Sequence, residues 1–213
     1  MKIAVIGAGG KAGRNIVKEA LDRGHEVTAI VRDASKIDAA GATVLQKDVF
    51  ALTADDLNPF DAIVNAFAAP FGEEHLHVDA GNVLIEAIEK GSGHPRLIVV
   101  GGAGSLYVDP EKTTRVVDTP GFPAMFFPTA SNQAKNLDIL RSNRNVKWTF
   151  VSPSAEFALG KRTGSYKKGT EFLLVNAQGD SYVSYEDYAI AIVDEIENPQ
   201  HINERFTVVS ERE

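Results

Sequence analysis

Short apolar runs rich in β-branched residues alternate along the chain with amphipathic stretches. Four of these runs are almost wholly apolar and cover residues 3–6, 27–31, 62–65 and 97–100. Two shorter runs cover residues 44–45 and 149–151. A run that lacks polar alternation is typical of a strand covered on both faces, as in a parallel sheet. The alternation of the two kinds of segment therefore predicts repeated βαβ units.

Apolar residues at helical spacing predict four helices between and after these strands. The first two apolar stripes stop before Gly24 and Gly91, which we expect to end the helices. A third helix is expected over about residues 131–141. Residues 184–187, Ser-Tyr-Glu-Asp, predict a capping box for the last helix, which Pro199 ends.

This order of elements predicts the α/β class, with a doubly wound parallel sheet and helices on both of its faces. No linker or repeat interrupts residues 1–213, so we expect one domain. Residues 1–151 are expected to form its core, and residues 152–213 a small C-terminal substrate-side cap with the last helix and strand. Two loops rich in glycine and proline, 101–128 and 152–169, follow predicted strands. Ligands of open α/β folds bind beyond the carboxyl ends of such strands.

Composition and charge narrow the classes of function. The 22 Lys and Arg residues against 29 Asp and Glu residues give a net charge of −7, which argues against a nucleic-acid partner. The chain has no cysteine, which excludes disulfides, thiolate metal sites and cysteine nucleophiles and suits a reducing compartment. No apolar run approaches the roughly 18 residues of a membrane span, and glycines replace the apolar region of a signal peptide. A soluble cytoplasmic protein without a membrane partner is expected.

A glycine-rich loop, Gly-Ala-Gly-Gly-Lys-Ala-Gly over residues 7–13, lies between the first predicted strand and the first helix. It satisfies both G-x-G-x-x-A and G-x-x-G-x-x-G. Glycine permits the tight turn and the close approach of the backbone to a pyrophosphate, and the helix N–H groups point at the anion. The sequence therefore predicts a Rossmann domain that binds NAD(P), with the pyrophosphate held by Gly7, Gly9, Gly10, Lys11, Ala12 and Gly13.

The end of the second strand bears on which nicotinamide cofactor is bound. An acidic residue there favours NAD, but this chain has Arg32 followed by Asp33. A guanidinium can bind a 2′-phosphate through two hydrogen bonds, and Lys11 adds positive charge, so NADP(H) is favoured over NAD(H). The alternative is a solvated Arg32, with Asp33 binding the ribose. Further cofactor contacts are expected after the third and fourth strands, at Asp48, Val49, Asn65, Ala66 and Phe67.

The glycine loop and six further motifs resemble one family. The motifs are residues 30–33, 47–49, 100–105, 145–153, 160–166 and 183–189. Together they resemble the atypical short-chain dehydrogenase/reductases over nearly the whole chain. The nearest subgroup is that of the small NAD(P)H-binding proteins known as NADH-flavin reductases, which are similar to biliverdin-IXβ reductase and more distantly to NmrA-like redox sensors.

The resemblance implies catalytic roles for Ser105, after the fifth strand, and for Lys135, which would also bind the nicotinamide ribose. It implies backbone contacts from Pro153 and Ser154 to the nicotinamide carboxamide. Typical members carry Tyr-x-x-x-Lys, but here Ser131 takes the place of the tyrosine. A serine hydroxyl is too weak an acid to replace a phenol, so carbonyl–alcohol chemistry is disfavoured. Hydride transfer to a flavin is less affected, because its remaining proton can come from solvent.

Aromatic residues in the two long loops are candidates for the substrate site. Phe126 and Phe127 lie in a proline-rich segment and would form a wall for an isoalloxazine or another planar ligand. The alternatives are a satellite core and a dimer contact. Tyr107 and Tyr166 would supply a proton or a stacking face, and the alternative is half-buried packing.

Two charged segments are weaker candidates. His75, His77 and Asp79 stand close in sequence, but residues i and i+2 of a helix point to different faces, so no metal site is predicted. A basic patch comprises Lys161, Arg162, Lys167 and Lys168. It is either a solvated loop or a surface that attracts an anionic substrate such as FMN.

These observations predict an NAD(P)H-dependent oxidoreductase that reduces a small planar acceptor by hydride transfer without a catalytic tyrosine. A flavin, FMN or FAD, is favoured as the acceptor. The alternative from another class is a non-catalytic NADP(H)-binding redox sensor of the NmrA-like type. An epimerase acting on a sugar nucleotide is disfavoured, because 213 residues leave little room for the usual substrate domain. The expected partner is a small-molecule substrate, and a homodimer is left open.

Overall fold

The apolar runs form the strands of one eight-stranded sheet in the computed structural model, which describes residues 1–37 and 40–212. The strand order is β3-β2-β1-β4-β5-β6-β10-β8. In chain order the bounds are β1 (Lys2–Ile6), β2 (Glu26–Val31), β3 (Thr43–Gln46), β4 (Ala62–Asn65), β5 (Arg96–Val100), β6 (Trp148–Ser152), β8 (Tyr166–Gly169) and β10 (Glu204–Ser210). All six predicted strands are present.

The sheet is doubly wound about β1, which pairs in parallel with β2 on one side and with β4 on the other. In this register Ile6 lies opposite both Ile30 and Asn65, so the carboxyl ends of the three strands lie side by side. The pairs from β3 to β10 are parallel, and β8 joins β10 as an antiparallel edge strand. The predicted Rossmann class is confirmed.

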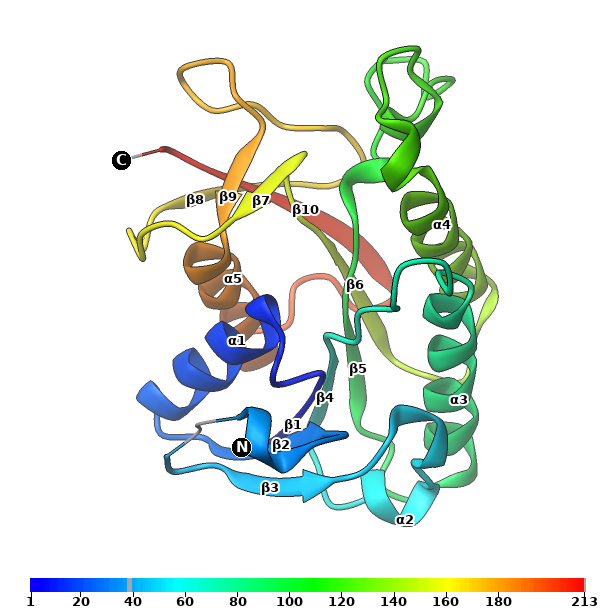
Figure 1. The fold of residues 1–213 in the computed structure, drawn as a ribbon, viewed down its shortest axis with the longest axis vertical. Coiled ribbons are helices and arrows are strands. Elements are labelled where there is room, and N and C mark those ends of the chain that lie inside the picture. The colour runs from blue at the N-terminus through cyan, green and yellow to red at the C-terminus, as the bar shows by residue number, and fades with distance from the viewer. Residues whose placement is uncertain (38–39, 213) are drawn as a thin grey trace.

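Helices cover both faces of the sheet (Figure 1). One face carries α1 (Lys11–Asp22) and α5 (Tyr185–Glu197), and the other carries α3 (Leu76–Lys90) and α4 (Phe127–Ser142), with the short α2 (Ala54–Leu57) beside α3. Successive side chains of a strand point to opposite faces. Accordingly Ile3 and Val5 belong to the apolar cluster with α1 and α5, whereas Ala4 and Ile6 belong to the cluster with α3 and α4.

Most of the predicted helix ends are confirmed. Gly24 has φ +80° and follows Arg23, the C-cap of α1, and its N–H donates to the Leu21 carbonyl at 2.9 Å. Ser184 caps α5, because its Oγ accepts from the Asp187 N–H at 3.0 Å. The carboxylate of Asp187 does not complete the predicted capping box and instead accepts from the Thr163 N–H at 2.8 Å. Neighbouring backbone N–H groups from another segment therefore compete with the local cap.

Two predictions about the long loops need correction. The third helix was expected from about residue 131, but α4 begins at Phe127. The proline at position 128 lies in the first turn of α4, where its missing N–H costs no hydrogen bond. Loop 101–128 also holds three 3-10 turns, η3 (Ala103–Ser105), η4 (Val116–Asp118) and η5 (Ala124–Phe126).

The predicted loop 152–169 contains β8 and a further short strand, β7 (Glu156–Ala158). β7 pairs in parallel with β9 (Tyr182–Ser184) in a separate two-stranded sheet. These strands are short and partly exposed, so the hydrophobic pattern gave no signal for them. β10 lies inside the main sheet, and the division of the chain at residue 151 stays a prediction. Among the described residues, none of the helices has the length and apolar character that a membrane crossing requires.

Candidate functional site

The glycine loop connects β1 to α1 at the carboxyl edge of the sheet. Gly7 has φ +72°, and a Cβ at this position would lie 2.4 Å from the Ala66 carbonyl oxygen. A Cβ on Gly13 would lie 2.3 Å from the Gly7 carbonyl oxygen. Since real side chains do not tolerate such contacts, both positions require glycine. The chain thus brings the start of α1 and the end of β4 into contact with the loop.

Gly10 precedes the first turn of α1, and its carbonyl accepts from the Arg14 N–H at 2.9 Å. The first N–H groups of a helix lack partners within the helix and carry the positive end of the helix dipole. A cavity of about 380 Å³ opens beside this helix start. Its lining comes from the glycine loop, the ends of β1, β2 and β4, and the segment after β3: Ile6, Gly7, Gly9, Gly10, Arg14, Ile30, Val31, Arg32, Asp33, Lys47, Val49, Ala66, Phe67 and Ala68.

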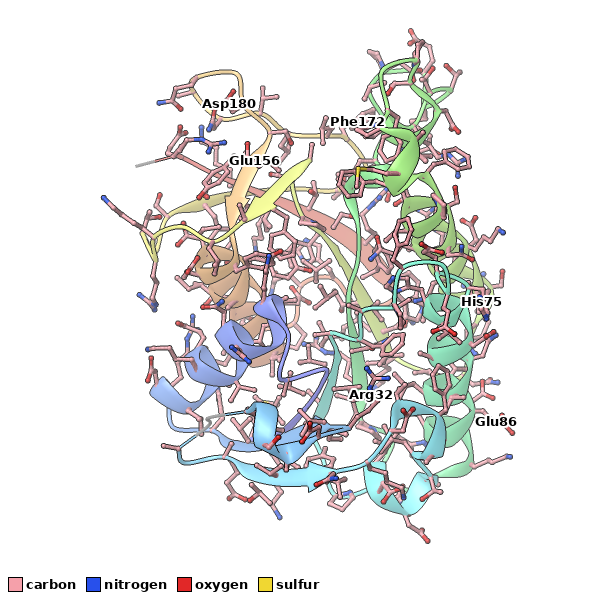
Figure 2. All side chains as sticks on the ribbon, viewed as in Figure 1. Arg32, His75, Glu86, Glu156, Phe172 and Asp180 are labelled. Atoms are coloured by element: carbon pink, nitrogen blue, oxygen red, sulfur yellow. The ribbon has the colours of Figure 1, made fainter. Side chains whose placement is uncertain are left out.

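Basic side chains gather at one end of this cavity. Arg32, labelled in Figure 2, follows β2 directly and is exposed, and Arg14 and Lys47 line the same space. The Lys47 ammonium contacts the Asp56 carboxylate at 2.6 Å, which offsets part of its charge. Asp33 also lines the cavity, and its carboxylate accepts from the Ser35 N–H at 3.0 Å and hydroxyl at 2.7 Å. This end of the cavity therefore carries a net positive charge.

The other wall of the cavity is aromatic and apolar. The Phe67 ring stands edge-on to Phe50, with 5.8 Å between ring centroids, and to His77, with 6.0 Å. Burial lowers the pKa of His77, so its ring favours the neutral form. Asn65 is buried, and its Oδ1 accepts from the Phe67 N–H at 3.2 Å. We conclude that Asn65 holds the turn that presents Phe67 to the cavity.

Seven of the predicted cofactor residues line the cavity: Gly7, Gly9, Gly10, Arg32, Val49, Ala66 and Phe67. Asp48 is adjacent, and its carboxylate caps the 3-10 turn η2 (Val49–Ala51) by accepting from the Phe50 N–H at 3.0 Å. Lys11, Ala12 and Gly13 belong to α1, where Lys11 is exposed. An anionic dinucleotide fits this arrangement, because a glycine cradle, a helix start and basic side chains border one space.

Sequence reasoning missed Arg14 and Lys47. Arg14 stands four residues after Gly10, on the first turn of the helix that the glycine loop opens. Lys47 directly follows β3 and belongs to one of the motifs that carried the family resemblance. Lys47 could have been identified by asking which basic residues follow the carboxyl ends of the strands, and Arg14 by asking which basic residues stand on the first turn of the helix after the glycine loop.

Ser105, Ser131 and Lys135, the predicted catalytic residues, are not among the residues that line this cavity. Ser105 is buried at the end of η3, and its Oγ accepts from the Arg205 guanidinium at 3.1 Å. Ser131 and Lys135 are both on α4. Lys135 is exposed, two residues from the buried Leu137, and therefore about 200° away around the helix axis. The catalytic role of Lys135, together with Ser105, stays a prediction from the family resemblance.

The predicted substrate residues have different environments. The Tyr166 hydroxyl donates to the Asp194 carboxylate at 2.5 Å, and burial together with this carboxylate raises its pKa well above the ordinary value. Phe126 and Phe127 remain about half exposed, so neither packs into a satellite core. Tyr107 pairs with Phe172, which is labelled at the top of Figure 2, where the segment before β9 approaches the loop after β5.

The remaining predicted residues follow β6. Pro153 and Ser154 are buried, and the Ser154 hydroxyl donates to the Val208 carbonyl at 2.7 Å. In the basic patch, Arg162 binds both carboxylate oxygens of Glu19, at 2.8 and 2.9 Å. This ion pair ties the segment between β7 and β8 to α1.

Comparisons with known proteins agree with this geometry. A family model described as NAD(P)H-binding matches residues 7–199. The uncharacterized protein YwnB of Bacillus subtilis (strain 168) is 62% identical over 214 aligned positions, which cover all of both chains. A crystal structure from Streptococcus pneumoniae TIGR4, of a protein called a "putative NADH-flavin reductase", is 46% identical and covers 99% of this chain and 100% of that one, with a TM-score of 0.93. A "putative epimerase" from Bacteroides thetaiotaomicron is 34% identical, covers 100% and 98%, and has a TM-score of 0.89.

Proposed function

Because the chain belongs to the NAD(P)H-binding family, within the atypical short-chain dehydrogenase/reductases, we propose that it is an NADPH-dependent reductase of a small planar acceptor. The single observation that carries the proposal is the cavity at the carboxyl edge of β1, β2 and β4. There the glycine cradle and the start of α1 border the same space as Arg32, Arg14 and Lys47.

The basic end of the cavity supports NADPH over NADH. The N–H groups at the start of α1 would hold the pyrophosphate, and the guanidinium of Arg32 would bind the 2′-phosphate of the adenine ribose. Arg14 would add to the positive potential at the same end. Asp33, the other candidate for the ribose, already accepts two hydrogen bonds from Ser35.

A flavin is the favoured acceptor because the chain offers no tyrosine at the expected position. When bound, the reduced nicotinamide supplies a hydride, which carries two electrons to the acceptor, while the remaining proton comes from water. The residues of this chain would then mainly hold two planar rings in contact and exclude water from them. The exposed Phe126 and Phe127 stand where η5 meets the start of α4, beyond the carboxyl end of β5, and would cover one ring.

The experiment that tests this proposal measures NADPH oxidation with a panel of acceptors: FMN, riboflavin, a quinone and a tetrapyrrole. We expect acceptor-dependent turnover, fastest with a flavin. Tight NADPH binding with no turnover on any acceptor would contradict the reductase and favour the redox sensor. That alternative predicts unequal affinity for NADPH and NADP⁺, because a ligand shifts only states that it binds unequally.

Gly10→Glu is the matched perturbation of the cofactor site. The φ of Gly10 is −77°, which suits any residue, and a Cβ there would lie 3.3 Å from the Gly7 carbonyl oxygen, a close contact that requires a small shift of the loop. The new carboxylate would stand at the start of α1 and repel the pyrophosphate. Gly10→Ala is the control, since it adds a side chain without charge.

The homodimer and the cytoplasmic location stay predictions from the sequence.

A further inference from the structure

The side chain of Arg205 on β10 is fully buried, and its guanidinium contacts the loop that follows β5. Its Nε donates to Glu171 Oε1 at 3.3 Å, and its Nη2 donates to Glu171 Oε2 at 2.6 Å and to the Ser105 carbonyl at 3.5 Å. Its Nη1 donates to Ser105 Oγ at 3.1 Å and to Ser152 Oγ at 3.4 Å. A guanidinium has five N–H donors, and each of them here has an acceptor.

The counterion of this guanidinium is Glu171, which also contacts Arg141 of α4 at 2.8 Å. Burial alone would raise the pKa of Glu171, but Arg205 and Arg141 together lower it below the ordinary value. The carboxylate is therefore charged at neutral pH. A buried charge is costly unless it is paired and hydrogen-bonded, and the bidentate ion pair fixes where the guanidinium lies.

This arrangement restricts what the Ser105 hydroxyl can do. A hydroxyl has one hydrogen to donate, and a guanidinium cannot accept it. Within residues 1–37 and 40–212, no acceptor is found for the Ser105 hydrogen. The positive charge beside its oxygen also makes this hydroxyl a stronger donor.

The two serines that accept from Arg205 differ in their access to a ligand. Ser105 ends η3 just beyond the carboxyl end of β5, at the edge of the sheet where ligands of this fold bind. Ser152 has no exposed surface, whereas Ser105 is 8% exposed. Of these two serines, only Ser105 has surface that a bound molecule can contact.

We propose that Arg205 is a positioning residue that holds the Ser105 hydroxyl as a hydrogen-bond donor toward the acceptor substrate. Such a donor selects acceptors with a carbonyl oxygen or ring nitrogen conjugated to the atom that receives the hydride, as in isoalloxazines and quinones. The inference rests on the proposed function.

The role of Ser105 is electrostatic. Hydride transfer breaks a C–H bond of the reduced nicotinamide, forms a new bond to hydrogen on the acceptor and leaves negative charge on the conjugated heteroatom. The Ser105 hydroxyl stabilises that charge through its hydrogen bond and keeps its own proton, while water supplies the proton that completes the reduction. The nicotinamide is oxidised and the acceptor is reduced by two electrons.

The test is a double-mutant cycle with Ser105→Ala and Arg205→Lys in the full-length protein. Each single variant is expected to lower kcat for riboflavin about tenfold or more, since removing one donor to a developing oxyanion costs on the order of 100-fold in well-studied cases. The double variant is expected to be no slower than the slower single variant, because both act through one hydrogen bond. Losses that multiply in the double variant would overturn the proposal.

Two controls separate positioning from general damage. Ser152→Ala removes another hydroxyl on the same guanidinium nitrogen, and Arg141→Met removes the second cation on Glu171. Both controls are expected to change kcat less than twofold. A control variant as slow as Ser105→Ala, with an unchanged Tm, would show that the whole network and not the Ser105 donor matters.

A binding readout keeps the inference independent of turnover. The Kd of riboflavin, measured by quenching of flavin fluorescence in the presence of NADP⁺, is expected to rise severalfold in Ser105→Ala and in Arg205→Lys, and no further in the double variant. Equal affinities in all four proteins would overturn the inference. Wild-type protein that binds riboflavin but oxidises no NADPH would instead contradict the proposed function.

Should Arg205→Lys fail to fold, Glu171→Gln provides the second route. Glu171 is partly exposed, so the amide is tolerated, and it releases the guanidinium from its charged partner. We expect a lower kcat with an unchanged Kd for NADPH. An unchanged kcat would overturn the positioning role.

Discussion

Replacing Arg32 with glutamine gives the sharpest test of which nicotinamide cofactor the cavity prefers. Arg32 is exposed, so its charge acts through a water-like dielectric and the larger energies of buried ion pairs do not apply. A pair of unit charges about 4 Å apart in water is worth about 1 kcal/mol, and a phosphomonoester carries a charge of about −1.5 to −2. Arg32→Gln is therefore expected to weaken NADPH binding by about 2 kcal/mol, or about 30-fold in Kd.

The assay is a fluorescence titration of NADPH and of NADH against wild type and variant at two salt concentrations. The Kd of NADH should hardly change, because NADH lacks the 2′-phosphate, and added salt should shrink the difference for NADPH. Arg144→Gln is the matched control: it removes one exposed arginine in the turn before β6 and lowers the net charge equally. Equal loss of affinity for both cofactors would refute the assignment of Arg32 to the 2′-phosphate.

Three further predictions concern stability. Gly7→Ala and Gly24→Ala both place a side chain at positive φ, but only at Gly7 would the new Cβ collide with backbone atoms. We expect Gly24→Ala to lower the free energy of unfolding by about 1 kcal/mol, or Tm by about 2–4 °C. Gly7→Ala is expected to lower both further and to abolish NADPH binding in a titration. Hydrogen bonds from arginine hold the pKa of Glu19 below its ordinary value of 4.5, so its stabilising contribution is complete above that pH and is lost as the pH falls through the lowered pKa. Unfolding scans from pH 7 to pH 3 should show a smaller fall in Tm for Glu19→Gln than for wild type. Tyr166→Phe should cost about 1 kcal/mol by losing its hydrogen bond to Asp194, with NADPH oxidation unchanged. A large loss of turnover at unchanged Tm would instead support the prediction that Tyr166 belongs to the substrate site.

The sequence was sufficient for those parts of the fold that repeat a simple pattern. The runs at β1, β2, β4 and β5 are apolar because both faces of these strands are covered. The glycine loop can be recognised in the sequence because a Cβ at Gly7 or Gly13 would collide with backbone atoms. Such constraints act on single positions or on a fixed period. They therefore leave a trace that one chain is enough to reveal.

The parts that were wrong or missed depend on distant residues. β8 is a polar edge strand that exists because β10 offers it a partner, and the capping box at Ser184 is incomplete because Thr163 takes the Asp187 carboxylate. The contact between Ser105 and Arg205 joins residues one hundred positions apart. No local pattern records such a contact.

The position of β10 in the sheet also has a consequence for the order in which the parts of the site are synthesised. Protein chains are synthesised from the N-terminus, and early segments can fold first. The strands β1 to β4, with the glycine loop and Arg32, precede β10 in the chain, so the residues that line the cofactor cavity are synthesised first. Arg205 arrives afterwards, between β6 and β8, and only then does Ser105 gain its partner. The residues proposed to bind the nucleotide are thus synthesised well before the residue proposed to position Ser105.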